Sequence, residues 1–415
     1  MTLVELAALP CNLCGTDTVT VLSTRSRSGQ PLRSVACTGC GLVWSDPRPH
    51  EARKFYEHDY RLAYKGTYRP RARHVLRAGR VALDRLEKCA RVLGPARRVL
   101  DVGSGGGEFA YLLKRLGHDV TGVEPNRGYA EHSREEYGLD VRVGFVGDVG
   151  LPAESFDVIT IWHVLEHTED PGAVLGQLRA ALRPEGRLVV EVPNVEATCQ
   201  SPRSSFHEAH LYTFCAATLA RLGAKAGLEQ VAFERSADGG NITMIFAPAA
   251  ACTDGAPALR IPGNHAQVAA VVKAHTSWSH ALSAHPWRRA ADRLTRWMSE
   301  TWALRRGTTG KALLDAMYPP QGDPATSPPA GTRQHTWGWL LAAYALAVAA
   351  EEVLLDNVVP AMQFGPSEGL AAYLGLQALV IGTLFLAFGR KMQSRRQLIA
   401  AGAWAMPLLA VPAIC

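Results

Sequence analysis

The stretch RRVLDVGSGGGEFAYLLKRLGHDVTGVE occupies residues 97–124 and decides the fold class. A short apolar run ends at Asp101 and opens into a glycine turn over residues 103–107. An amphipathic helix pattern follows, and a second apolar run ends at Glu124. This order of strand, glycine turn, helix, strand and acid is the unit that holds a nucleoside against a parallel sheet. The sequence therefore predicts a Rossmann-like α/β fold.

The glycine turn also suggests how a ligand is held. Glycines let the backbone approach a ligand closely, and a helix N-terminus presents free N–H groups to a carboxylate or phosphate. Glu124, at the end of the second strand, can accept hydrogen bonds from both ribose hydroxyls. The motif alone does not separate two cofactors, although Glu108 stands where a dinucleotide fingerprint would have its third glycine.

Later segments add to this pattern in a fixed order. Asp148 follows a third strand, SFDVITIWHVLEH covers residues 155–167, and PEGRLVVEVPN covers residues 184–194. With the D-x-G-x-G-x-G turn, residues 97–235 resemble the class I S-adenosylmethionine (SAM) methyltransferases, in the small-molecule branch that includes quinone and sugar methyltransferases. The resemblance implies a seven-stranded methyltransferase domain over residues 96–250, with an antiparallel final strand.

The resemblance also implies which residues bind SAM. The turn holds the methionine part, Glu124 holds the ribose, and the adenine amino group meets the acid after the third strand. His163, at the end of the fourth strand, lies where the backbone of the family meets the methionine end. The predicted cofactor residues are Asp101, Gly103, Ser104, Gly105, Glu124, Asp148 and His163.

A histidine-rich segment, HEAHLYTF at residues 207–214, follows the fifth strand. In this branch a similar segment closes the substrate pocket. A histidine with a pKa near 6.5 can take a proton from a hydroxyl or an acidic carbon as the methyl group moves. We predict His210 as the base, with His207 as the alternative. Helix capping, internal hydrogen bonding and a second metal site of two histidines and a glutamate remain open for the same residues.

Four cysteines near the N-terminus form two pairs, Cys11-x2-Cys14 and Cys37-x2-Cys40. Four thiolates suit tetrahedral zinc with no open position, so we expect structural Zn²⁺ in a zinc-ribbon-like module over residues 1–50. The alternatives are buried thiols without metal, or disulfides. A four-cysteine module ahead of this methyltransferase type resembles the sugar C-methyltransferases of deoxysugar pathways.

The chain of 415 residues is too long for one ordinary domain, and its net charge of +6 implies no nucleic-acid footprint. The first residues lack a basic and then apolar leader, so we expect the catalytic part in a reducing cytoplasm. Residues 51–95 read as a helical connector, because 70–94 have an amphipathic helix pattern.

The C-terminal third does not resemble a soluble methyltransferase. The sequence of residues 251–335 predicts amphipathic helices and a Pro-rich linker. Within it, the predicted helix at 286–306 is basic and contains tryptophans, so it could bind an anionic membrane surface or dock on the catalytic domain. Residues 336–415 contain three apolar stretches, of which 369–389 has no charge over 21 residues. We expect transmembrane helices here, with a buried helical bundle as the alternative.

Charge orients these stretches, since four basic residues lie at 390–396 and none at 356–368. The predicted protein is thus a SAM-dependent methyltransferase anchored in the cytoplasmic membrane, with its catalytic domain on the cytoplasmic side. Its acceptor would be a small molecule or a lipid-linked one, such as a sugar nucleotide or a quinone. The alternatives are an NAD-dependent oxidoreductase and a non-catalytic membrane protein that retains a methyltransferase fold.

Overall fold

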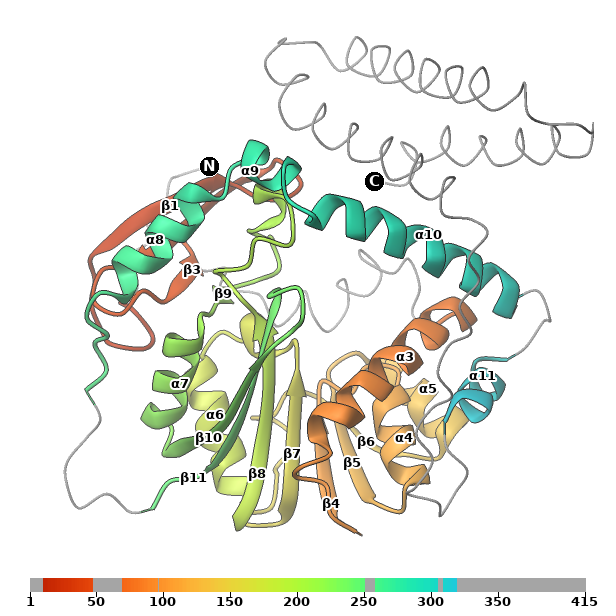
Figure 1. The fold of residues 1–415 in the computed structure, drawn as a ribbon. Coiled ribbons are helices and arrows are strands. Elements are labelled where there is room, and N and C mark those ends of the chain that lie inside the picture. Colours follow the sequence, from red (N-terminus) through yellow and green to blue (C-terminus); the bar gives the residue numbers. More distant parts are fainter. Residues whose placement is uncertain (1–9, 48–68, 96, 251–257, 305–308, 319–415) are drawn as a thin grey trace, which may run out of the picture. The chain divides into compact units, whose positions relative to one another are not determined.

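A seven-stranded sheet forms the centre of the computed structural model, which describes residues 10–47, 69–95, 97–250, 258–304 and 309–318 (Figure 1). The strand order is β10-β11-β8-β7-β4-β5-β6. The strands are β4 (Arg98–Val102), β5 (Asp119–Glu124), β6 (Asp140–Val143), β7 (Phe156–Trp162), β8 (Leu182–Pro193), β10 (Leu228–Arg235) and β11 (Asn241–Pro248). The strands from β6 to β8 pair in parallel, and β11 is antiparallel to both β8 and β10. The predicted Rossmann-like sheet with an antiparallel last strand is confirmed.

Helices cover both faces of this sheet (Figure 1). Successive strand residues point to opposite faces, so Val99 belongs to one apolar cluster and Leu100 to the other. The first cluster contains residues of α3 (Ala72–Cys89), α4 (Glu108–Arg115) and α5 (Arg127–Tyr137). The second contains residues of α6 (Pro171–Ala181) and α7 (Ala216–Lys225). Both faces are buried, which explains why the strands read as continuous apolar runs.

A second sheet of four strands has the order β1-β2-β3-β9. Its strands are β1 (Val19–Arg25), β2 (Pro31–Cys37), β3 (Val43–Ser45) and β9 (Tyr212–Thr213). The last strand comes from the histidine-rich segment after β8, since Trp44 pairs with Tyr212. Leu42 and Trp44 also belong to the same buried cluster as Leu100. The cysteine module therefore shares its sheet and its core with the methyltransferase-like part, as a piece of about 40 residues requires.

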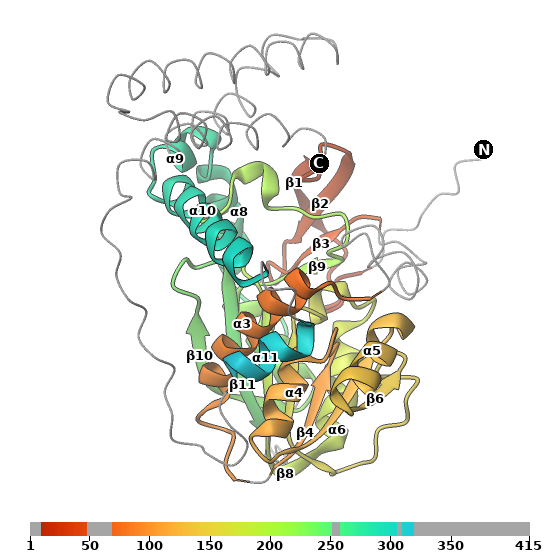
Figure 2. The ribbon, with the colours of Figure 1, turned by 90° about the vertical axis from the view of Figure 1, so that its right-hand side faces the viewer.

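Two helices after residue 250 pack on this body. The helix α8 (Asn264–Ala274) lies against β1 and β2, and α11 (Gly310–Met317) lies along α3 (Figure 2). Leu314 of α11 is fully buried, and a Cβ on Gly79 of α3 would lie 2.5 Å from its Cδ2 atom. The Tyr318 hydroxyl donates to the Glu108 carbonyl over 2.9 Å. The segment that supports the glycine-turn helix thus extends well beyond residue 250.

The predicted basic helix is present as α10 (His285–Leu304), preceded by α9 (Ser277–Ala281). Trp287 is 36% exposed and Trp297 is 41% exposed. Across the described ranges, no helix is both long enough and apolar enough to cross a membrane. The predicted transmembrane stretches at 336–415 lie outside the described residues, so they stay predictions.

Candidate active site

The glycine turn after β4 brings the backbone close to its neighbours. Gly103 has a φ of +69°, and a Cβ at this position would lie 2.3 Å from the Val164 side chain. Gly105 has a φ of +58°. Any other residue would be strained at both positions, and at Gly103 it would also clash. The turn lies at the carboxyl ends of β4 and β5, where ligands of such sheets bind.

Glu124 is fixed at the end of β5, beside this turn, and is 2% exposed. Its Oε2 atom accepts a hydrogen bond from the Gly105 N–H over 2.8 Å, and its Oε1 atom accepts one from the Asn126 N–H over 3.0 Å. A carboxylate oxygen can accept more than one hydrogen bond. The geometry is compatible with the predicted ribose contact and gives Glu124 a second role, as a clamp on the glycine turn.

Unpaired polar atoms gather beside the turn. Asp101 Oδ1 accepts from the Thr160 hydroxyl over 2.8 Å, but the buried Oδ2 has no hydrogen-bond partner among the described residues. The same is true of Ser104 Oγ and of Arg85 Nε, which comes from α3. Arg85 lies over the Trp162 ring, 5.1 Å from its centroid. A buried carboxylate oxygen and a buried guanidinium nitrogen without hydrogen-bond partners among the described residues fit the ammonium and carboxylate groups of the methionine part of SAM.

Burial raises the pKa of Asp101 to about 6, although the nearby Arg85 opposes this shift. The sequence reasoning did not find Arg85, because residues 70–94 carry several arginines and nothing in the sequence distinguishes this one. Asp148 is exposed in the turn after β6, where its N–H donates to the Phe145 carbonyl over 2.9 Å. Its contact with adenine stays a prediction.

His163 lies between two carboxylates rather than facing the glycine turn alone. Its Nδ1 atom is 3.3 Å from Glu166 Oε1, and its Nε2 atom is 3.3 Å from Glu191 Oε1. Burial disfavours its charged form, but hydrogen bonds to both acids outweigh this and raise the pKa of His163 to about 9. The residue also has a φ of +53°, a strained conformation for a histidine. It is therefore a cation at neutral pH that holds two acids together.

Glu191 and Lys88 complete this network and were not predicted. Burial disfavours ionisation of Glu191, yet hydrogen bonds from His163 and Lys88 outweigh it and lower its pKa to about 2. The Thr243 hydroxyl donates to the same carboxylate over 2.7 Å. A usable signal was present, because Glu191 is the one acid inside the apolar strand sequence LVVEVP.

The two histidines predicted as bases lie close together. The His207 and His210 rings are stacked with centroids 4.8 Å apart, and His210 is 4.9 Å from the His167 ring. Burial lowers the pKa of His207 to about 4 and that of His210 to about 3. Both are neutral at pH 7 and can accept a proton, but both are weaker bases than a free imidazole. His207 Nδ1 also accepts from the Ala209 N–H over 2.9 Å, so internal hydrogen bonding, one of the alternatives, does occur.

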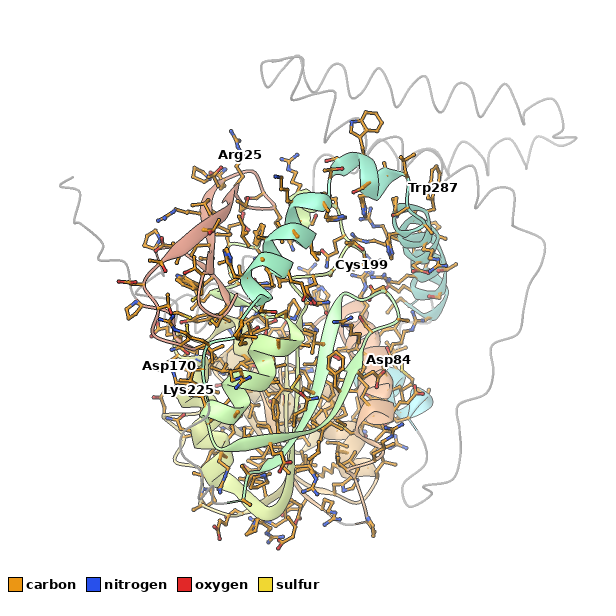
Figure 3. The ribbon with its side chains drawn as sticks, turned by 60° about the vertical axis from the view of Figure 1, so that its left-hand side comes forward. Arg25, Asp84, Asp170, Cys199, Lys225 and Trp287 are labelled. Carbon is orange, nitrogen blue, oxygen red and sulfur yellow. The ribbon has the colours of Figure 1, made fainter. Side chains whose placement is uncertain are left out.

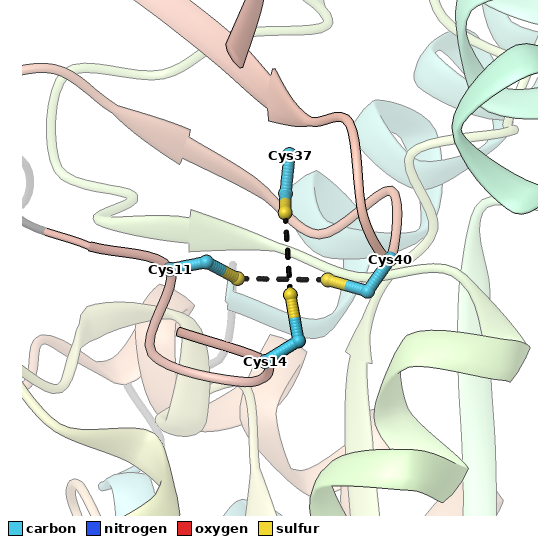
Figure 4. Close-up of side chains that lie close together, drawn as sticks. All are labelled: Cys11, Cys14, Cys37 and Cys40. Atoms are coloured by element: carbon cyan, nitrogen blue, oxygen red, sulfur yellow. Dashed lines mark hydrogen bonds between the residues drawn. The ribbon is translucent and has the colours of Figure 1, made fainter. Parts of the chain in front are cut away.

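The four cysteine side chains converge as the spacing predicts (Figure 4). The Sγ atoms of Cys11 and Cys40 are 3.5 Å apart, and those of Cys14 and Cys37 are 3.4 Å apart. Tetrahedral zinc with Zn–S bonds of about 2.3 Å would place them about 3.8 Å apart. All four are free cysteines, so the disulfide alternative is wrong for this module. The residues fit Zn²⁺, which Cys11, Cys14, Cys37 and Cys40 would hold.

Hydrogen bonds join this module to the helices α6, α7 and α8. Asn12 Nδ2 donates to Asp170 Oδ1 over 3.1 Å, and the Lys225 ammonium donates to the Asn12 carbonyl. Asp170 and Lys225, at the N-terminus of α6 and the end of α7, lie beside each other in Figure 3. Asn264 of α8 donates to the Cys40 carbonyl over 2.7 Å.

Comparison with known proteins agrees with this geometry. Residues 71–232 match the sequence profile of a family described as "Methyltransferase domain". The chain contains a class I SAM-dependent methyltransferase domain. The match favours this assignment over the NAD-dependent oxidoreductase alternative.

Similar proteins include the ubiquinone biosynthesis O-methyltransferases of Azorhizobium caulinodans and Xanthomonas axonopodis pv. citri. The first is 35% identical over 112 residues, which are 25% of this chain and 44% of the relative. The second is 38% identical over 117 residues, which are 26% of this chain and 49% of the relative. The chain thus spans about half the length of the curated relatives that it matches. A solved structure of the 1,6-didemethyltoxoflavin-N1-methyltransferase of Burkholderia thailandensis is also similar, with 22% sequence identity and a TM-score of 0.40. The matched region is 50% of this chain and 96% of the Burkholderia chain.

Proposed function

We propose that this chain methylates a hydroxyl group of a small-molecule acceptor with SAM as the methyl donor. The observation that carries the proposal is the set of unpaired, buried polar atoms of Asp101, Ser104 and Arg85 beside a glycine turn clamped by Glu124. When bound, SAM supplies a methyl group on a positively charged sulfur. The names of the ubiquinone biosynthesis relatives support an oxygen nucleophile and a quinone-like acceptor.

On the acceptor side, His207 or His210 would take the proton of the hydroxyl. Both are neutral imidazoles at pH 7, which is the form that a base requires. The cysteine module holds their segment, because the Arg27 N–H donates to the Phe206 carbonyl over 2.8 Å and the Ser45 hydroxyl donates to the His210 carbonyl over 2.9 Å. The role of zinc in this proposal is therefore to shape the acceptor side.

A membrane-bound, lipid-linked acceptor is the finer version of this proposal. It is supported by the uncharged stretch 369–389 and by exposed apolar side chains of α9 and α10. Trp278 is 63% exposed and Trp287 is 36% exposed, and Arg288 and Arg293 lie exposed on the same segment. Basic helices with exposed tryptophans bind anionic membrane surfaces. Cosedimentation of the full chain with anionic vesicles, and its absence with neutral ones, would support this version.

Calorimetry with S-adenosylhomocysteine on the full chain tests the cofactor assignment. Glu124→Gln should weaken binding by roughly 1.5–3 kcal/mol, since it removes a charged acceptor of hydrogen bonds. Glu229→Gln, the same change on exposed edge strand β10, is the control and should leave the affinity unchanged. Transfer of labelled methyl groups from SAM to a panel of hydroxylated acceptors tests the activity. Equal affinity of the wild type and Glu124→Gln would contradict the ribose assignment.

A further inference from the structure

Three potential metal ligands from two segments converge on the acceptor side. Glu166 and His167 belong to the turn η2 (Leu165–His167) after β7, and His210 belongs to the segment before β9. One ligand atom from each lies within 4.8 Å of the others. The segments are joined where the Leu211 N–H donates to the Glu166 carbonyl over 2.8 Å. The set differs from the second metal site considered from the sequence, because it takes Glu166 and His167 in place of His207 and Glu208.

The ring of His167 is oriented as a ligand. Its Nδ1 atom is 2.8 Å from the Ala209 carbonyl oxygen. A carbonyl only accepts hydrogen bonds, so Nδ1 carries a proton and, in the neutral ring, Nε2 carries a lone pair. This Nε2 atom is 4.0 Å from Glu166 Oε1. A backbone carbonyl that fixes the outer ring nitrogen, with the inner nitrogen facing a carboxylate, is the arrangement that supports metal-binding histidines.

Glu166 supplies an independent observation. It is 1% exposed, and its Oε2 atom has no hydrogen-bond partner among the described residues. Its Oε1 atom is engaged by His163 Nδ1 at 3.3 Å. An unpaired oxygen of a buried carboxylate is costly, because the group loses its hydration without replacement. A cation at this oxygen would remove the cost.

Charged groups also face this set. His163 binds Glu166 through its Nδ1 atom, and Glu191 lies behind His163.

We propose that Glu166, His167 and His210 bind a divalent transition-metal ion on the acceptor side of the site. Two imidazoles and one carboxylate leave coordination positions open, as in catalytic rather than structural metal sites. There the ion would bind the acceptor oxygen and make its proton easier to remove. His210 is then a ligand, and His207 is the remaining candidate base. The part played in methyl transfer rests on the proposed function, whereas metal binding itself does not.

Cobalt(II) substitution of the full chain tests the proposal. After removal of metals by a chelator and reloading with Co²⁺, elemental analysis should find a second equivalent of cobalt beyond the one in the cysteine module. The cysteine-bound ion gives thiolate-to-cobalt charge-transfer absorption, and an ion bound by nitrogen and oxygen gives only weak ligand-field bands. Glu166→Gln should lose the second equivalent and its bands while the charge-transfer absorption remains. His207→Asn is the matched control and should keep both equivalents.

Persistence of the charge-transfer absorption and of S-adenosylhomocysteine binding shows that a variant is folded. Should Glu166→Gln fail this check, His210→Ala replaces it, with the same expected loss of one equivalent. A single equivalent in the wild type, two equivalents in the folded variants, or equal loss in His207→Asn would overturn the proposal. Two equivalents without any methyl transfer would contradict the proposed function and leave the metal site standing.

Discussion

Replacing His163 by asparagine should reduce the loss of folding stability that the protein shows as the pH rises into the alkaline range. In the wild type, His163 is a cation between Glu166 and Glu191, with a pKa of about 9. Its ordinary pKa is about 6.5, and the rise from there to about 9 corresponds to at most ~3.4 kcal/mol. The side chain is 36% exposed, and solvent screening reduces the value to roughly 1–2 kcal/mol.

The sign follows from the direction of the shift. A pKa raised in the folded state means that the folded state binds the proton more tightly. The stabilisation is therefore complete below about pH 6.5 and disappears as the pH rises through about 9. Asparagine suits this position, because it tolerates the positive φ of +53° better than most residues, so the backbone is disturbed little.

Urea unfolding of the full chain and of His163→Asn, from about pH 6 to about pH 10, measures this effect. The difference in the free energy of unfolding between the two should shrink by roughly 1–2 kcal/mol across this range, since other titrating groups cancel in the difference. His118→Asn is the matched control. Burial lowers the pKa of His118, so its difference should stay constant above about pH 7. A constant difference for His163→Asn would refute the double ion pair.

Two further changes test the support of the site. Cys11→Ser combined with Cys40→Ser should remove zinc from the cysteine module, as elemental analysis would show. The double change should lower methyl transfer more than S-adenosylhomocysteine affinity, because the module donates hydrogen bonds to the segment of His207; an equal loss of both would contradict this separation. Leu314→Ala should destabilise the chain by about 2–5 kcal/mol, because it leaves a cavity between α11 and α3. Leu282→Ala is the control, at a side chain that is 86% exposed, and should change stability by less than about 0.5 kcal/mol. Similar shifts in melting temperature for the two variants would refute the packing of α11.

The geometry of the glycine turn was predictable because its signal is local. The turn, Asp101 and Glu124 lie within 24 residues of one another, and the turn needs backbone conformations that few residues other than glycine adopt. The central strands β4 and β7 read correctly for a similar reason, since they are buried on both faces and therefore mostly apolar. Such features depend on the segment itself more than on its partners.

The features of the candidate site that the sequence did not predict depend on contacts between distant segments. Lys88 meets Glu191 across 103 residues, and Arg85 meets Trp162 across 77 (162 − 85). The pattern of α3 predicts a helix but does not state which of its basic residues points at the sheet. Likewise, the pairing of Trp44 with Tyr212 makes the histidine segment part of the cysteine module's sheet, and no periodicity in either segment specifies the other.

The two sides of the site are therefore built by different means. The cofactor side is formed by consecutive elements of the large sheet, β4, α4 and β5, which fix Glu124 through backbone hydrogen bonds. The proposed acceptor side consists of η2 and the segment before β9, and the second of these pairs with β3 of the cysteine module. In the proposed function, the cysteine module would therefore act on the choice of acceptor, and the glycine turn on the binding of SAM.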